Sequence, residues 1–224
     1  MNENILVVAV HPDDETLGCG GTLLRHKLSG DNINWLIITG IGKENGYSEE
    51  RTKIRNLEID RVSVEYGFTK VFRLNYPATM LESVPKNILV NSIGNIFNEI
   101  QPSTIYLQHH GDAHSEHKAV FEAAFACTKV FRYPYISKVF VMETISETNF
   151  ASPHINNFFI PNFFVDITDF LSKKIEIMEL YEGEMGEHPF PRSKESLTSL
   201  ATLRGVQCGV KFAEAFMVLK YILK

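Results

Sequence analysis

The sequence predicts an α/β protein built on a mainly parallel sheet. The first observation is an unbroken apolar, largely β-branched run at 5–10, which is typical of a strand that is buried on both faces. The second is that more strand-like runs follow, with helix-length segments between most of them. Strands that alternate with helices form βαβ units, in which the strands are parallel. The further runs lie at 35–39, 71–74, 104–108 and 138–142.

The segments between these strands carry helix signals. The glycines at 18, 20 and 21 should lead into a first helix that ends near Ser29. Ser48, followed by two glutamates, marks the start of a second helix that should stop at Gly67. Two more helices are expected at 87–100, with Ile88, Ile93, Ile96 and Phe97 inward, and at 115–131.

The pattern is weaker after residue 142. An edge strand at 163–167 and covering helices at 171–181 and 193–203 are compatible with it. The chain has 224 residues, which is enough for one substantial core, and no shift in composition divides it. We therefore expect a single domain over 1–224.

Composition excludes several classes of protein. The net charge of −5, with no basic stripe, argues against a nucleic-acid binder. The longest apolar runs are strand-sized, so no transmembrane segment is expected. The three cysteines are far apart and lack C-x-x-C spacing, and the first strand follows the N-terminus without a leader-like stretch. These features together predict a cytoplasmic protein.

A histidine and three acids follow the first strand: His11, Asp13, Asp14 and Glu15, with Pro12 among them. They come where the strand leaves the carboxyl edge of the sheet, which is where open α/β sheets bind their ligands. Repulsion among three neighbouring carboxylates has to be offset, and a bound divalent cation does so most simply. The cluster is therefore interpreted as half of a metal site.

A second polar cluster, at 109–117, follows the strand at 104–108 and contains four histidines. His114 and His117 are three residues apart at a predicted helix start, which puts both imidazoles on one face. Two imidazoles, one carboxylate and an open position suit a catalytic zinc or another first-row divalent ion. Water at the open position would have a lowered pKa, and a free carboxylate beside it could serve as general base.

Other interpretations of these residues stay open. Each cluster taken alone is also compatible with a solvated turn or a helix N-terminus. The sequence Gly18-x-Gly20-Gly21 invites a dinucleotide-binding interpretation, but the glycines do not directly follow the strand and three acids would face the pyrophosphate. No G-x-S-x-G elbow is present, which disfavours a covalent hydrolase.

The motifs together resemble the PIG-L/LmbE family of zinc-dependent N-deacetylases. The stretch 9–15 reads A-V-H-P-D-D-E against the family's A-H-P-D-D-E, and 114–117 reads H-S-E-H against its H-P-D-H. Arg55-x-x-Glu58 is similar to the family's R-x-x-E, and the resemblance extends through 162–167, 188–189 and 204–216. Glu116, in place of aspartate, does not fall on a predicted ligand, and it could alter the support of a ligand histidine.

The resemblance implies a role for each matching residue. One zinc ion per chain, or another divalent metal, would be bound by His11, Asp14 and His117. Asp13 would be the general base that activates water. His114 would polarise the acetyl carbonyl or stabilise the oxyanion, and it could protonate the departing amine. Arg55 would hold sugar hydroxyls or an attached phosphate, with Arg51 as the alternative.

The resemblance also implies a fold and a reaction. The fold would be a Rossmann-like three-layer sandwich. The reaction would remove an N-acetyl group from an N-acetylated amino sugar or its glycoconjugate, so the partner would be a small-molecule N-acetyl sugar. The alternatives are a deacylase of a non-sugar amide and a catalytically inactive, metal-dependent sugar-binding protein. The phenylalanines near 158–164 would suit a homo-oligomer.

Overall fold

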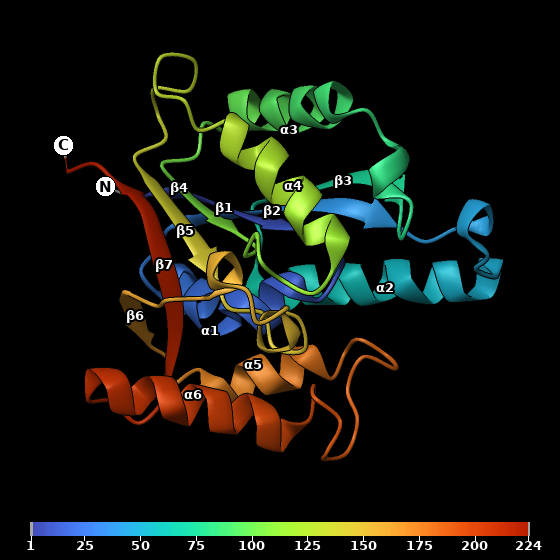
Figure 1. Cartoon of the computed structure of the whole chain (residues 1–224). Helices are drawn as coiled ribbons and strands as arrows, with labels where there is room; N and C mark the ends of the chain where they lie inside the picture. Colours follow the sequence, from blue (N-terminus) through green and yellow to red (C-terminus); the bar gives the residue numbers. More distant parts are fainter. Residues whose placement is uncertain (1, 224) are drawn as a thin grey trace.

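The protein forms one seven-stranded sheet with helices on both faces, in a computed structural model that describes residues 2–223 (Figure 1). The strand order is β3-β2-β1-β4-β5-β7-β6, and the first five strands along the chain are parallel to one another. The predicted α/β class and mainly parallel sheet are thus confirmed. These five strands are β1 (Asn4–Ala9), β2 (Asn32–Gly40), β3 (Lys70–Pro77), β4 (Thr104–Leu107) and β5 (Lys138–Met142).

The C-terminal part of the chain completes the sheet. The edge strand β6 (Phe163–Asp166) lies where a strand was expected. The sequence analysis did not predict β7 (Ala213–Tyr221), which pairs antiparallel with both β5 and β6. Its partners are distant in sequence, so the local pattern carried little information on this pairing.

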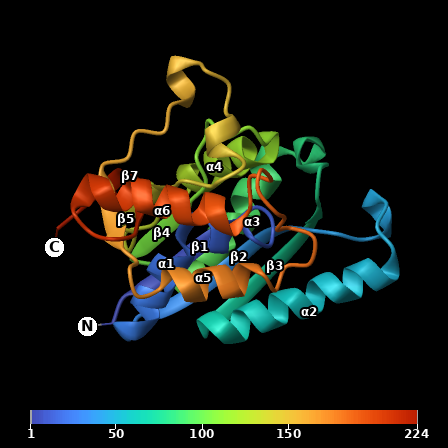
Figure 2. The ribbon, with the colours of Figure 1, turned by 90° about the horizontal axis from the view of Figure 1, so that it is seen from below.

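Helices cover both faces of the sheet, which gives the expected three layers. Alternate residues of β1 face opposite ways, so Ile5 and Val7 enter one core while Leu6 and Val8 enter the other. In Figure 1, the helices of one layer lie below the sheet and those of the other layer lie above it, and Figure 2 shows the lower layer from below. Those below are α1 (Asp14–Leu28), α2 (Glu49–Tyr66), α5 (Leu171–Met178) and α6 (Lys194–Cys208); those above are α3 (Lys86–Ile100) and α4 (Ser115–Ala126). Short 3₁₀ helices lie at Lys43–Asn45, Leu81–Ser83, Thr148–Phe150 and Ile155–Asn157.

Some helix predictions are confirmed and others are wrong. The hydroxyl of Ser48 caps α2 by accepting the N–H of Arg51 at 3.1 Å, and Gly67 ends the helix at φ 68°. α4 ends at Ala126, five residues before the predicted end. Ile88 is 44% exposed rather than inward, because the buried stripe of α3 passes instead through Leu89, Ile93, Phe97 and Ile100.

The first helix begins at Asp14, so its glycines lie inside it rather than before it. α1 breaks at Cys19, whose φ of −146° is not helical. The backbone of α1 packs closely against neighbouring side chains there. A Cβ on Gly18 would lie 2.5 Å from the sulfur of Met142, and one on Gly21 would lie 2.6 Å from Cγ2 of Ile167. Only glycine permits this close approach.

A buried ion pair fills the break in α1. The carboxylate of Glu214, on β7, accepts the N–H groups of Gly21 and Thr22 at 2.9 and 2.7 Å. Nζ of Lys174, on α5, donates to the carbonyl of Leu17 at 2.9 Å and lies 2.7 Å from Glu214. Each charge thus satisfies backbone groups that the break leaves without helical partners. The pair thereby fixes the first turn of α1, which carries Asp14.

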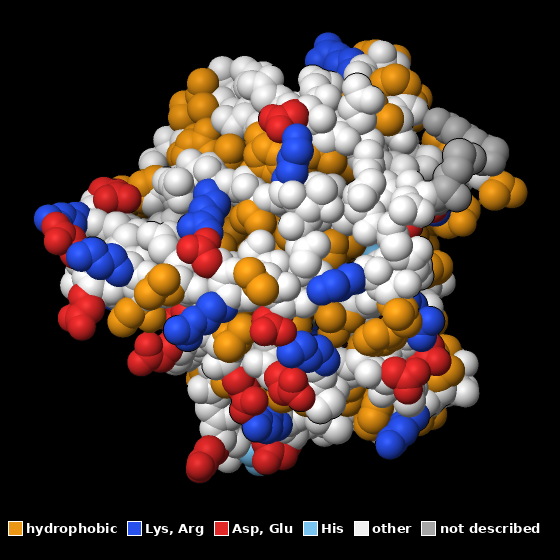
Figure 3. All heavy atoms as spheres, turned by 180° about the vertical axis from the view of Figure 1, so that it is seen from behind, with side chains coloured by type: hydrophobic (Ala, Val, Ile, Leu, Met, Phe, Trp, Pro, Cys, Tyr) orange, Lys and Arg blue, Asp and Glu red, His pale blue; other side chains and the backbone are white. Residues whose placement is uncertain are grey.

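No helix within residues 2–223 is long and apolar enough to cross a bilayer. On the face shown in Figure 3, Lys and Arg side chains lie among Asp and Glu side chains rather than in a basic stripe.

Candidate active site

The polar segments that follow β1 and β4 meet at the carboxyl edge of the sheet. β1 and β4 are hydrogen-bonded neighbours, and the chain leaves β1 toward one side of the sheet and later continues from β4 toward the other. This is the topological switch point at which open α/β sheets bind ligands. The ring centre of His11 lies 4.5 Å from that of His114 and 5.6 Å from that of His117. The two predicted clusters therefore form one site.

Three side chains direct donor atoms at a common point. Nε2 of His117 lies 3.3 Å from Oδ1 of Asp14, and Nδ1 of His11 lies 3.8 Å from Oδ2 of Asp14. The ligand atoms of the three residues all lie within 4.8 Å of one another. Two imidazole nitrogens and one carboxylate, with room for a further ligand, form a donor set that suits zinc. The residues predicted as ligands thus fit a divalent ion.

A carboxylate holds the far nitrogen of each histidine. Oδ2 of Asp112 lies 2.8 Å from Nδ1 of His117, and Oε2 of Glu116 lies 2.8 Å from Nε2 of His11. Glu116 is itself fixed by the N–H of Leu81 at 2.8 Å. Such partners set the tautomer and the orientation of metal-binding histidines. His11, His114 and Glu116 also lie close enough to hold a cation, but a cation there would compete with the bond from Glu116 to His11.

The charges of Asp14 and His117 stabilise each other. The N–H groups of Val10 and His11 donate to Oδ2 of Asp14 at 2.9 and 2.8 Å, which leaves Oδ1 facing His117. Burial alone would raise the pKa of Asp14, but His117 outweighs it and the pKa lies below its usual range. Burial alone would lower the pKa of His117, but Asp14 raises it. A bound cation would replace the proton that this pairing favours.

Asp13 combines a strained backbone with a buried carboxyl group. Its φ of 144° lies in a region that residues other than glycine rarely adopt. Its N–H donates to Oε2 of Glu15 at 3.1 Å, and Glu15 in turn accepts the hydroxyl of Tyr181 at 2.8 Å. Burial, together with the charge of Asp14, raises the pKa of Asp13 well above its usual value. A carboxylate with a raised pKa is a better base toward water.

Arg55 lies beneath this turn with its guanidinium fully engaged. Nη1 donates to the carbonyl of Pro12 at 3.1 Å, and Nε lies 3.1 Å from Glu58. Nη2 forms an ion pair with Glu184. Arg51 also pairs with Glu58, at 2.9 Å. Arg55 therefore fixes the turn after β1, and its contact with a substrate stays a prediction.

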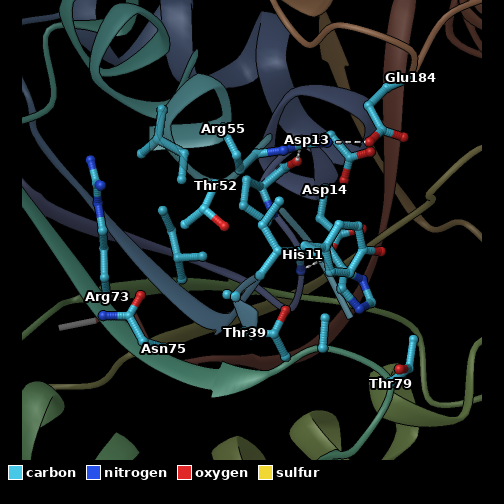
Figure 4. Close-up of a pocket in the computed structure, with 18 of the residues that line it drawn as sticks. His11, Asp13, Asp14, Thr39, Thr52, Arg55, Arg73, Asn75, Thr79 and Glu184 are labelled. Carbon is cyan, nitrogen blue, oxygen red and sulfur yellow. Dashed lines mark hydrogen bonds and ion pairs between the residues drawn. The ribbon is translucent and has the colours of Figure 1, made fainter. Parts of the chain in front are cut away.

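The site opens into a cavity of about 660 Å³. Figure 4 shows Asp13 and Asp14 on one side of the cavity and Arg73 and Asn75 on the other. His11, His114, His117 and Arg55 also line it, so all six predicted site residues lie in the cavity wall. His188, which the family resemblance covers, is exposed and does not line the cavity.

Sequence reasoning missed several residues of the site. Asp112 could have been noticed, because it lies five residues before His117 in the second cluster. Glu184 and Arg192 come from the loop after α5 and are paired at 3.0 Å, and no local motif marks them. Glu147 was not missed in the same way: its place after a strand end is equally compatible with a substrate contact and a surface turn, and the structure puts it in the cavity lining.

The sequence matches the family model described as PIG-L, GlcNAc-PI de-N-acetylase, over residues 6–128. This match spans more than half of the chain. The protein belongs to the PIG-L family. The match includes 9–15 and 114–117, the stretches that carry the candidate metal ligands, and ends just after α4.

Comparison with individual proteins shows that the similarity to other PIG-L-like chains continues beyond residue 128. A diacetylchitobiose deacetylase of Thermococcus kodakarensis is 24% identical, with 95% of this chain and 81% of that protein covered. A probable N-acetyl-α-D-glucosaminyl L-malate deacetylase of Bacillus anthracis is 23% identical, with 81% of each covered. The solved structure of a conserved protein of Thermus thermophilus superposes with a TM-score of 0.79 at 25% identity, covering 99% of this chain and 97% of the other. The fold is thus that of known structures throughout.

Proposed function

We propose that this PIG-L protein is a zinc-dependent hydrolase that removes the N-acetyl group from an N-acetylated amino sugar or its glycoconjugate. The observation that carries the proposal is the convergence of His11, Asp14 and His117 beside Asp13 in one cavity. The names of the family and of both relatives support it, because each describes a deacetylase of an N-acetylated sugar.

The residues supply the groups that amide hydrolysis needs. A zinc ion held by the three ligands supplies Lewis acidity, which lowers the pKa of water and polarises a carbonyl. Asp13 would accept the proton of the attacking water and pass it to the departing amine. Nδ1 of His114 accepts the N–H of Glu116 at 3.3 Å, so Nε2 would be the atom that donates to the developing oxyanion.

The test measures metal content together with acetate release from a panel of N-acetylglucosamine derivatives. We expect about one zinc ion per chain. Asp13→Asn should keep the metal and lose about 10²–10⁴-fold in kcat, the range for a general base. His188→Ala is the matched control, because His188 is exposed and outside the cavity. A wild-type protein that binds no divalent metal would refute the proposal.

The alternatives predict different results in the same panel. A deacylase of a non-sugar amide would release no acetate from the N-acetylglucosamine derivatives, and it would release an acyl group from amides without a sugar, which are added to the panel. An inactive sugar-binding protein would bind the derivatives and release no acetate from any of them. Zinc as the native metal, a single domain over 1–224, a cytoplasmic location and assembly into a homo-oligomer are part of the proposal, and they need separate measurements.

A further inference from the structure

The cavity offers no unpaired cationic side chain among the described residues. Four arginines line it, and each lies within 4.0 Å of a carboxylate. Arg73 lies 2.6 Å from Asp60, and Arg55 is held by two glutamates. The remaining pairs are Arg51 with Glu58 at 2.9 Å and Arg192 with Glu184 at 3.0 Å. An incoming anion would have to compete with an existing ion pair at each of these positions.

Several carboxylates of the cavity, in contrast, have no cationic partner within residues 2–223. Asp13, Glu44 and Glu147 line the cavity, and none of them forms an ion pair with Lys or Arg there. Glu147 is half-buried, and its carboxylate accepts only the hydroxyl of Ser146, at 3.3 Å. The unpaired charge that the protein presents to a substrate, apart from the metal position, is therefore negative.

The N-terminus of α2, which also borders the cavity, does not offset this negative charge. Helix N-termini attract anions through free N–H groups. Here Ser48 already accepts one of these N–H groups, and Glu49 and Glu50 occupy the first turn. These carboxylates offset the positive end of the helix dipole.

The part of the cavity away from the metal position carries neutral polar groups. Tyr47, Thr52 and Asn75 line it, and Tyr47 is 41% exposed at the rim. Hydroxyl and amide groups of this kind suit sugar hydroxyls. A volume of about 660 Å³ falls within the range of roughly 300–1,000 Å³ for small-molecule sites, so it has room for more than the reacting sugar.

We propose that the substrate is an oligosaccharide in which the reacting N-acetyl sugar is joined to a neutral or amine-bearing sugar. Conjugates that carry phosphate or carboxylate there are disfavoured, because they meet Glu44 and Glu147 and find every guanidinium occupied. This inference rests on the proposed deacetylase function and selects among the substrates of that reaction.

The experiment compares zinc-loaded wild-type protein on matched glycosides of N-acetylglucosamine. The attached group is glucosamine, glucose, malate or phosphate. We expect kcat/KM for the two sugar-linked compounds to exceed that for the two anionic compounds by about tenfold or more, as for one or two like-charge contacts in a wet cavity. The ratio should shrink in 0.5 M salt because exposed charges are then screened.

Variants that each remove one carboxylate show which residue disfavours the anionic compounds. Glu147→Gln should raise kcat/KM for the anionic compounds about three- to tenfold relative to the sugar-linked ones. Glu44→Gln should act in the same direction but less, since Glu44 is exposed and more strongly screened. Glu122→Gln is the matched control: Glu122 is exposed, pairs with Lys86 and does not line the cavity, so the ratio should not change.

The outcomes separate this inference from the proposed function. If an anionic conjugate is turned over as well as the sugar-linked compounds, the inference is wrong while the deacetylase stands. If no compound is turned over, the deacetylase proposal fails, and the charge preference is read instead from calorimetric binding of the four compounds to the metal-loaded Asp13→Asn variant. Equal or tighter binding of the anionic compounds there also overturns the inference.

Discussion

Replacing Lys174 with methionine should destabilise this fold far more than the loss of a surface lysine. The ammonium of Lys174 has two partners, the carbonyl of Leu17 and the carboxylate of Glu214, and both lie in the interior. The side chains of the ion pair are only 7% and 5% exposed. Methionine would fill much of the same volume but leave that carbonyl without a donor and Glu214 with an uncompensated charge.

The expected loss of stability follows from the hydrogen-bond partners that Glu214 would keep. Removing one partner of a buried ion pair costs about 3–5 kcal/mol. Glu214 would keep the N–H groups of Gly21 and Thr22 and the hydroxyl of Thr22, so we expect the lower end, about 3 kcal/mol. For a chain of 224 residues this corresponds to a fall in Tm of about 6–12 °C. Urea unfolding followed by circular dichroism measures the loss of free energy directly.

The neighbouring Lys173 provides a matched control. It belongs to the same helix, but its partners Glu65 and Glu176 lie at the surface and its side chain is 43% exposed. Lys173→Met should therefore cost no more than about 0.5 kcal/mol. Equal free energies of unfolding for the two variants would refute the reasoning, because the break in α1 would then not depend on the buried pair.

Three smaller changes test other contacts. Asp112→Asn removes the charge that orients His117, so zinc affinity measured by chelator competition should fall about 10–100-fold without loss of folding. Ser48→Ala removes the cap of α2 and should cost about 1 kcal/mol in urea unfolding; no change would mean that water replaces the cap. Gly21→Ala inserts a methyl group 2.6 Å from Ile167, so about 1–3 kcal/mol should be lost; a stability equal to wild type would mean that the side chain of Ile167 moves away freely.

The residues that converge at the candidate metal site could be found from sequence because they lie in two local clusters. His11 and Asp14 are three residues apart after one strand, and His114 and His117 have the same spacing at the start of a helix. Each pair needs only its own strand end to come into place, and the parallel sheet then brings the two strand ends together. The five parallel strands could be found for a similar reason, since each contains a short run of mostly apolar residues.

The C-terminal part of the fold and site could not be predicted in this way. β7 lies between β5 and β6, so its position depends on pairing over long sequence separations. Glu214 reads as one polar residue in an apolar strand, and only the break in α1 gives it two N–H groups to accept. Glu184 acquires its role from Arg55, which lies 129 residues away. No periodicity or short motif encodes contacts of this kind.

The supports of the two candidate ligand histidines and the lining of the cavity come from different segments of the chain. Each ligand histidine takes its supporting carboxylate from the same polar cluster after β4, Asp112 for His117 and Glu116 for His11. The cavity beyond the metal position is instead lined by the loop after β2, by α2, by the end of β3 with the turn after it, and by the connections after β5 and α5. Substitutions in those segments can change the charge that a substrate meets while the metal ligands and their supports stay intact. The two relatives, 23–24% identical to this chain, are in fact named for substrates that differ in the group attached to the sugar.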